Sequence, residues 1–382
     1  MRIGKQYLAT VIVSIILIYI GHNFAIQGLF IFQGISNEVV RARVISITDR
    51  VQPSEEFDDF EEFDDFLISM LGEKLLFEAQ IRRGARRGQI VIAEQSLSSF
   101  QMTPSREVRA GDSILLINFS DEWFFNGHIR TNNLLILGII FSLGVLIFGG
   151  RKGFNTLLSL SLTCAAVFAV FIPSILSGKN IYSMAALVCA YTTIMTLLIV
   201  SGFNKKSLAA AIGCISGIVV TGMISLIMDR VLSLTGIVDE HSRYLISLPL
   251  ENPINLRGII FAGIIIGAMG AIMDVAMSIA SSLWEVKEKA PRINFETLFR
   301  SGISIGRDIM GSMANTLILA YIGSSLSVVI LLGVYSNSLL DLFNTEMIVV
   351  EILQALSGIF GILSAMPLTA FFCATFYLKK SS

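Results

Sequence analysis

Two neighbouring apolar segments in the second half of the chain each carry a line of polar residues that includes an aspartate. In the first segment, Ser278, Ser281 and Glu285 follow Asp274 at steps of four, three and four residues. Steps of three and four also relate the polar residues of the second segment, which are Ser301, Ser304, Asp308, Ser312 and Asn315. This spacing places each set on one face of a helix. Ionisable groups are rare in membrane helices because they are costly there, so each aspartate is a candidate functional residue.

The first chemistry that fits this pair of segments is a proton or ion relay. Hydrocarbon favours the neutral form of a carboxyl group, whereas a nearby cation favours the charged form. A carboxyl group balanced between the two can load and release a proton, and we expect Asp274 to be that group. The other residues of the predicted relay are Asp308, Arg307 and Asn315 on the second helix, with Ser278 and Glu285 on the first.

Two other interpretations of the aspartates stay open. In one, Asp274 pairs with Arg307 and merely holds the two helices together. In the other, Asp274 and Asp308 share a proton, as the two carboxylates of an aspartyl intramembrane protease do. The sequence before Asp308 is Ile305-Gly306-Arg307, which lacks the glycine-x-glycine that such proteases place there.

Glycines accompany both polar stripes. Gly263 and Gly267 form a GxxxG step in the first segment, which lets another helix approach closely. The glycines predicted to serve in helix packing are Gly263, Gly267, Gly270, Gly302, Gly306 and Gly311. Between the segments, residues 285–300 mix aromatic and basic side chains, which is typical of an amphipathic connection on the inner membrane surface.

The composition shows which class of protein carries these helices. Of the 382 residues, 54% are hydrophobic and only 15% are charged, whereas soluble domains have about 25% charged residues. This excludes an ordinary cytosolic enzyme, a coiled coil and a disordered protein. The net charge of -1 gives no basic excess that would favour nucleic acid as a partner. The expected surroundings are a lipid bilayer.

A bilayer-crossing helix needs about 20 mostly apolar residues, and eight segments meet that requirement. They lie near residues 7–24, 132–149, 155–176, 182–202, 207–234, 257–284, 307–334 and 347–377. Lys and Arg fall in alternate loops, which predicts cytoplasmic N- and C-termini. The first segment lacks a cleavage site and is predicted to be an uncleaved signal anchor.

The predicted fold is therefore a polytopic α-helical membrane protein with a small β-rich domain outside the cytoplasm, between the first two helices. Residues 1–32 form the anchor, 33–130 the β-rich domain and 131–382 a domain of seven helices. Alternating β-branched residues at 39–47, 89–93 and 113–118 predict a barrel or sandwich of five or six strands. The acidic repeat at 55–66 is interpreted as a solvated loop, with binding of a cation or partner as the alternative.

Motifs for other chemistry are absent from the sequence. The four cysteines and three histidines have no metal-ligand spacing. There is no Walker-type phosphate loop, nucleophile elbow or zinc motif. We therefore expect no cofactor, no metal and no enzymatic activity, apart from the protease alternative.

Two blocks of sequence, Gly270–Ser282 and Ser301–Tyr321, resemble the YibE/F-like family of bacterial multi-pass membrane proteins. The resemblance implies a plasma-membrane location and one anchor followed by an outer domain and a run of spans. It implies no established activity. The partner that it suggests is a paralogous membrane subunit, whereas the glycine steps suggest a second copy of the chain.

A weaker similarity concerns the layout of resistance–nodulation–division permeases and the SecD/SecF export factors. In both, an aspartate-bearing helix is followed by an amphipathic cytoplasmic segment and a helix with small polar residues, and by analogy Asp274 is the proton site. The predicted function is an ion- or proton-coupled transporter or export-assisting permease. The alternatives are an envelope assembly or scaffolding protein and, second, the intramembrane protease.

Overall fold

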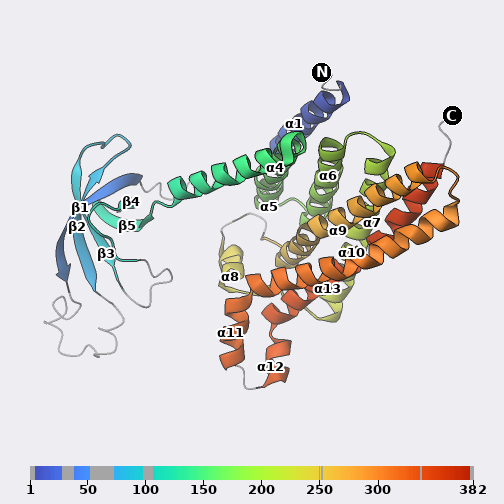
Figure 1. Cartoon of the computed structure of the whole chain (residues 1–382). Helices are drawn as coiled ribbons and strands as arrows, with labels where there is room; N and C mark the ends of the chain where they lie inside the picture. Colours follow the sequence, from blue (N-terminus) through green and yellow to red (C-terminus); the bar gives the residue numbers. More distant parts are fainter. Residues whose placement is uncertain are drawn as a thin grey trace. The chain divides into compact units, whose positions relative to one another are not determined.

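The computed structural model describes residues 5–27, 38–51, 73–97, 106–119, 121–248, 250, 253–335 and 338–378. It contains two compact units, a helical unit of residues 1–30 and 145–382 and a second unit of residues 31–144. Figure 1 labels their elements. The acidic repeat at 55–66 lies outside the described residues.

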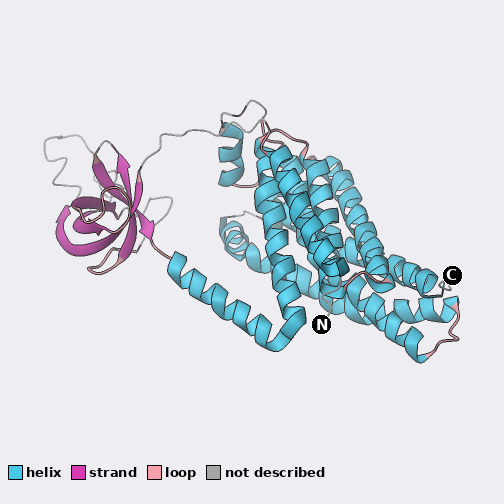
Figure 2. Ribbon diagram, turned by 90° about the horizontal axis from the view of Figure 1, so that it is seen from above, coloured by secondary structure: helices cyan, strands magenta, loops and turns pink. Residues whose placement is uncertain are grey.

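Helices dominate the described part of the chain (Figure 2). They are α1 (Lys5–Ala25), α4 (Thr131–Ala166), the π-helix η1 (Val167–Phe171), α5 (Ile172–Leu176), α6 (Ile181–Ser201), α7 (Lys205–Val231), α8 (Glu240–Ser247), α9 (Leu256–Lys289), α10 (Phe295–Ser324), α11 (Leu326–Tyr335), α12 (Leu339–Asn344) and α13 (Glu346–Leu378). Asparagine side chains cap several of them. At α9, for example, Asn255 Oδ1 accepts a hydrogen bond of 3.0 Å from Gly258 N, which satisfies one free amide of the first turn.

Six helices of the described residues are long and apolar enough to cross a membrane, so the predicted eight spans are not confirmed. The predicted segments 132–149 and 155–176 lie in one helical run of 46 residues, Thr131–Leu176. Its backbone leaves the helical region at Gly150, where φ is 52° and ψ is -125°. The predicted segment 307–334 is divided between α10 and α11 at Ser325, and its polar residues lower its hydropathy.

The centre of the helical unit consists of α7, α9 and α13 (Figure 1). Glycines bring α7 and α13 into backbone contact: a Cβ atom at Gly217 would lie 2.8 Å from the carbonyl oxygen of Gly361. At Gly361, a Cβ atom would lie 2.0 Å from Thr221 Oγ1. Gly213 and Gly217 thus form a GxxxG step at which two helices of this chain meet, a step that was not among the predicted packing glycines.

The helix α1 packs against α4, η1 and α6 within the helical unit. Its Ser14 carbonyl oxygen accepts a hydrogen bond of 3.2 Å from Tyr191 Oη of α6. Near its start, Tyr7 Oη donates to Asn155 Oδ1 over 2.9 Å. Gly21 lies against Val170. These contacts show that α1 is an integrated member of the helical unit.

The second unit contains a closed barrel of five strands, β1 (Val39–Val51), β2 (Lys74–Ile81), β3 (Ile90–Ser96), β4 (Ser113–Phe119) and β5 (Glu122–His128). The order around the barrel is β1-β2-β3-β5-β4, antiparallel except for the pair β3–β5. The predicted small barrel is therefore confirmed, with five strands. This is a Greek-key barrel of the kind found in OB-folds.

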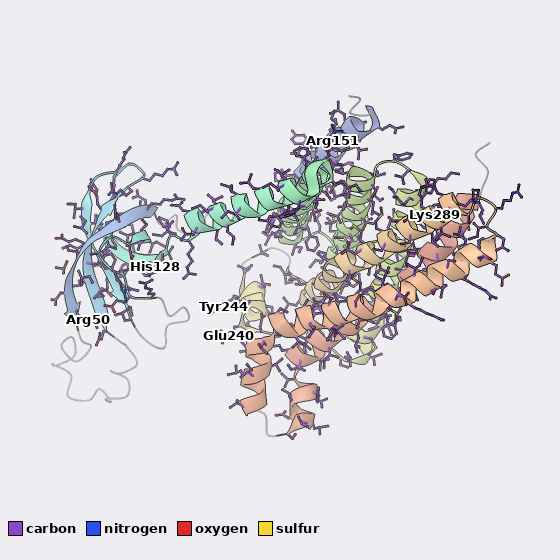
Figure 3. The ribbon with its side chains drawn as sticks, viewed as in Figure 1. Arg50, His128, Arg151, Glu240, Tyr244 and Lys289 are labelled. Atoms are coloured by element: carbon purple, nitrogen blue, oxygen red, sulfur yellow. The ribbon has the colours of Figure 1, made fainter. Side chains whose placement is uncertain are left out.

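Alternation of side chains explains the barrel. In β2, Leu75, Phe77, Ala79 and Ile81 are buried, and the residues between them are half-buried. Period-two burial of this kind is expected for strands with one face toward a core. On the outside, Arg50 (labelled in Figure 3) forms ion pairs with Glu73 and Glu107.

Candidate functional site

Asp274 lies on the open face of α9. The opposite face of this helix supplies large buried residues to the core, among them Ile272 and Ile279. Asp274 itself is exposed and makes no hydrogen bond or ion pair with any residue that the structure describes. No heavy atom lies within 4 Å of the Cβ position at Gly263 or Gly270 on the same face. An unpaired carboxyl group therefore sits beside an open, glycine-lined strip.

Two other members of the predicted relay lie on this face of α9. Ser278 is half-buried one turn beyond Asp274. Glu285 is exposed and forms an ion pair of 2.8 Å with Lys289, which Figure 3 labels at the end of α9. The stripe that the sequence predicted on α9 is thus present as one continuous face.

The stripe on α10 faces away from α9. The buried face of α10 is set by its glycines, since a Cβ atom at Gly306 would lie 2.2 Å from Met366 Cγ and 3.2 Å from Ile279 Cδ1. Asp308 follows Gly306 by two residues, which corresponds to a turn of about 200° around a helix. Asp308 is accordingly exposed. The other exposed residues of this outward face are Ser304, Arg307, Gly311, Ser312 and Asn315.

This rotation of α10 changes the predicted partnership. No ion pair joins Asp274 to Arg307 among the described residues. The interpretation in which this pair holds α9 and α10 together is therefore not supported. Asp274 and Asp308 do not share a facing surface, which gives no support to chemistry by paired aspartates. Residue spacing does not determine the rotation of α10 about its axis, so the two stripes were predicted to face each other across one helix pair.

The six glycines predicted for helix packing divide in the same way. Gly302 and Gly306 lie at the contact of α10 with α9 and α13, and Gly267 lies against Tyr321. Gly263, Gly270 and Gly311 have open space around their Cβ positions. Among the residues that the structure describes, these last three therefore meet no neighbouring helix, which differs from the expectation from spacing.

Polar residues of α13 lie near the glycine strip, and the sequence analysis missed them. A Cβ atom at Gly267 would lie 2.7 Å from Tyr321 Oη and 3.5 Å from Gln354 Nε2. Tyr321 Oη belongs to α10 and is buried beside Gln354 of α13. Glu351 is half-buried one turn before Gln354. Its position inside the predicted segment 347–377 was the available signal, because ionisable residues within apolar runs point to function.

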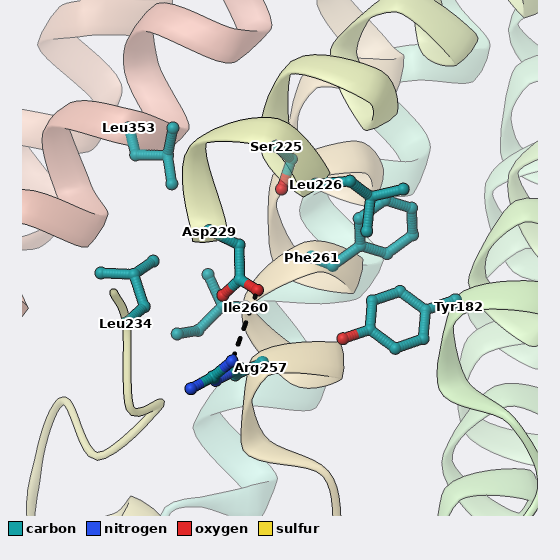
Figure 4. A pocket seen from close by; sticks show the side chains of 9 residues that line it. All are labelled: Tyr182, Ser225, Leu226, Asp229, Leu234, Arg257, Ile260, Phe261 and Leu353. Carbon is teal, nitrogen blue, oxygen red and sulfur yellow. Dashed lines mark ion pairs between the residues drawn. The ribbon is translucent and has the colours of Figure 1, made fainter. Parts of the chain in front are cut away.

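A second polar cluster joins three helices (Figure 4). Asp229 of α7 pairs with Arg257 of α9 over 4.0 Å, and the hydroxyl group of Tyr182 of α6 points toward Arg257. The pocket that these side chains and Ser225 line leaves no room for a water molecule. The cluster therefore ties α6, α7 and α9 together at this end, about 25 Å along α9 from Asp274 at 1.5 Å per residue.

The start of α13 fixes a nearby loop. Glu346 accepts hydrogen bonds from Thr235 N at 2.8 Å, from Thr235 Oγ1 at 2.7 Å and from Gly236 N at 2.7 Å. Gly236 has a φ of 91°, and a Cβ atom there would lie 2.6 Å from Leu256 Cβ. The carboxylate thus holds the loop after α7 against the ends of α9 and α13.

Comparison with known proteins identifies the family. The model of the YibE/F-like proteins matches residues 137–379, well over half of the chain. The chain belongs to the YibE/F-like family. The match begins within α4, continues to the end of α13 and excludes the barrel. No curated protein and no solved structure gives a significant match, so the weaker likeness to resistance–nodulation–division permeases and SecD/SecF has no support here.

The family and the apolar helices together indicate a multi-pass membrane protein. Within the residues that the structure describes, no group of three or more His, Cys, Asp or Glu side chains could hold a metal ion. The chemistry available along α9 is therefore that of a single carboxyl group, neighbouring hydroxyl groups and a terminal ion pair.

Proposed function

We propose that this YibE/F-like protein is an ion- or proton-coupled transporter or export-assisting permease, with Asp274 as the group that binds and releases the proton. The observation that carries the proposal is that Asp274, on an open face of α9, has no hydrogen bond or ion pair with any described residue. A charged group in a span is costly without a partner or water, and a carboxyl group can avoid that cost by taking up a proton.

The proposed path follows α9. Ser278 and Ser281 continue the face of Asp274 toward Glu285 and Lys289, where the helix ends. Hydroxyl groups at these positions can donate and accept hydrogen bonds and so connect Asp274 with the membrane surface. Arg307, Asp308 and Asn315 lie on the outward face of α10 and are not part of this path.

Transient charge movement tests the proposal without knowledge of the substrate. Purified protein is reconstituted in liposomes and adsorbed to a solid-supported membrane, and a rapid pH step is applied. A proton that enters the membrane field at Asp274 displaces charge, so wild type gives a transient current that Asp274→Asn lacks. The matched control is Asp341→Asn, which alters an exposed carboxylate of α12. Equal currents in wild type and Asp274→Asn would exclude Asp274 as the coupling site.

The plasma membrane is the proposed location, with both termini in the cytoplasm and residues 33–130 outside. The support is the placement of basic residues at the α4 turn, at the start of α7 and at the end of α9, namely Arg151, Lys152, Lys205, Lys206, Lys287 and Lys289. Basic residues favour the cytoplasmic side. Protease added to intact spheroplasts should cut the barrel unit and spare a C-terminal tag, and the reverse pattern would contradict the orientation.

An envelope assembly or scaffolding role is the second candidate, because the barrel exposes large apolar side chains. Ile90 and Ile92 of β3 are 60% and 62% exposed, and Ile45 and Ile47 of β1 are also exposed. Both strands neighbour β2, so the side chains belong to one sector of the barrel. In a strain that depends on this protein, Ile90→Ser with Ile92→Ser should abolish complementation if assembly is the function, while Asp274→Asn should leave it intact.

A further inference from the structure

The outward face of α10 exposes two opposite charges side by side. Arg307 and Asp308 are both exposed, and neither forms a hydrogen bond or ion pair with any described residue. The exposed residues Ser304, Ser312 and Asn315 share their face. At Gly311, no heavy atom lies within 4 Å of the Cβ position. Nothing in the described part of the chain covers this face.

The packing of α10 places this face alongside the middle of a membrane-length helix. Leu317, Gly306 and Gly302 contact Gly358, Met366 and Ala370 in turn along α13, and α13 extends from Glu346 to Leu378. Arg307 and Asp308 therefore lie at the level of Met366, well inside the ends of α13. Because α13 is one of the six membrane-length helices, both charges lie at the depth of a span, although α10 itself is too polar to be among the six.

Hydrocarbon cannot be the neighbour of such a face at low cost. A charged side chain at the centre of a span is costly. Charged residues in spans therefore face other protein or a water-filled cavity. Partial relief by an ion pair with a residue of the same chain is absent here, since the described opposite charges lie elsewhere.

We infer that the outward face of α10 is the contact between two copies of this chain, in which Asp308 of each copy pairs with Arg307 of the other. Copies inserted with the same orientation are related by a two-fold axis along the membrane normal, so that residues of equal depth meet. Because positions 307 and 308 carry opposite charges at nearly equal depth, the face is complementary to itself. The open space at Gly311 lets the second helix approach closely. This inference does not depend on the proposed transport function.

Charge exchange tests the inference. Full-length protein carrying a donor or an acceptor fluorophore at a C-terminal tag is reconstituted together in liposomes, and energy transfer is followed as lipid is added. Wild type should remain paired on dilution. Arg307→Asp and Asp308→Arg each create two like-charge contacts across the axis, so each should weaken association by about tenfold or more.

The decisive sample mixes the two single variants. One copy then presents two aspartates and the other two arginines, so both cross-axis contacts become complementary again and energy transfer should return. The chain that carries both exchanges should also associate. The control Asp341→Arg reverses an exposed charge on α12 and should leave association unchanged. Wild type that is monomeric throughout, or single variants that associate as well as their mixture, would overturn the inference.

Discussion

The contact between α7 and α13 makes a quantitative prediction at Gly213. A Cβ atom there would lie 1.9 Å from Thr369 Oγ1, 2.8 Å from Thr369 Cβ and 3.0 Å from Thr369 Cα. Carbon atoms in contact are about 3.5–4.0 Å apart, so Gly213→Ala forces the two helices apart by about 0.5–1 Å. Rotation of the threonine side chain cannot relieve this clash, because it includes a backbone atom.

The expected cost combines two terms. Overpacking of a well-packed contact costs about 1–3 kcal/mol, and the backbone clash places Gly213→Ala at the upper end of that range. Alanine in a helix recovers about 1 kcal/mol relative to glycine. The net loss in the free energy of unfolding is therefore about 2 kcal/mol. The matched control is Gly263→Ala, which meets no atom within 4 Å and should be neutral or stabilising by up to about 1 kcal/mol.

The assay is reversible unfolding in mixed micelles, with sodium dodecyl sulfate as the denaturant and circular dichroism as the signal. The double variant Gly213→Ala with Thr369→Gly removes the clashing side chain, so it should lose less stability than the sum of the single variants by about 1 kcal/mol or more. If Gly213→Ala unfolds no earlier than Gly263→Ala, the packing that we describe for α7 and α13 is refuted.

Three further substitutions test local structure by hydrogen-exchange mass spectrometry. Glu346→Ala removes the acceptor for Thr235 and its neighbour, so the loop after α7 should open more easily by about 2–3 kcal/mol, and unchanged exchange would show that the carboxylate does not hold it. At Asp239, burial raises the pKa of the carboxyl group, but hydrogen bonds from Ser242 outweigh it and the net pKa is lowered. The ionised carboxylate of Asp239 therefore stabilises α8 above the ordinary pKa, and this stabilisation is lost as the pH falls through the lowered pKa. In wild type, exchange in α8 should rise at low pH, and Asp239→Asn should abolish this pH dependence. A variant that keeps the pH dependence would show that another group causes it. The buried side-chain amide of Gln95 donates to the carbonyl oxygen of Arg106 and accepts from the backbone amide of Val108, in the segment before β4. Gln95→Leu removes both bonds, so the free energy that protects the barrel strands from exchange should fall by about 2–3 kcal/mol. Unchanged exchange would show that other contacts support this segment.

Sequence patterns determined the barrel well. Alternating apolar residues placed strands at 39–47 and 113–118, close to the observed β1 and β4. In a strand with period-two alternation, the apolar positions are the ones that face the core, so the sequence also predicts which side chains are buried. Strand order, including the parallel pair β3–β5, could not be predicted because it depends on contacts between distant segments.

The helices were harder to predict in two respects. Hydropathy placed a break between residues 149 and 155, and the backbone does leave the helical region at Gly150. It could not show that helical residues continue on both sides of Gly150 without an intervening loop. Spacing defined the polar face of α10, yet it could not decide which neighbour that face meets. Gly302 and Gly306 determine the rotation of α10 about its axis. Both contact α13, so the face of α10 that carries these glycines is buried and the polar face points outward.

The same limitation applied to the GxxxG steps. Gly263 with Gly267 and Gly213 with Gly217 have equal spacing, but only the second pair admits a partner helix at both positions. Spacing predicts that a close approach is possible, and the partner decides whether it occurs. Glu351 and Gln354 were missed for a related reason, because their relation to α9 arises from packing between helices distant in sequence.

The protonation of Asp274 is the central claim, and infrared difference spectroscopy measures it most directly. Carboxyl bands of the lipid-reconstituted protein are recorded between about pH 5 and 9 for wild type and Asp274→Asn. We predict a band in wild type that titrates within this range and is absent from the variant. The absence of any such difference would mean that the carboxyl group keeps one charge state throughout, which would contradict a proton-exchanging role for Asp274.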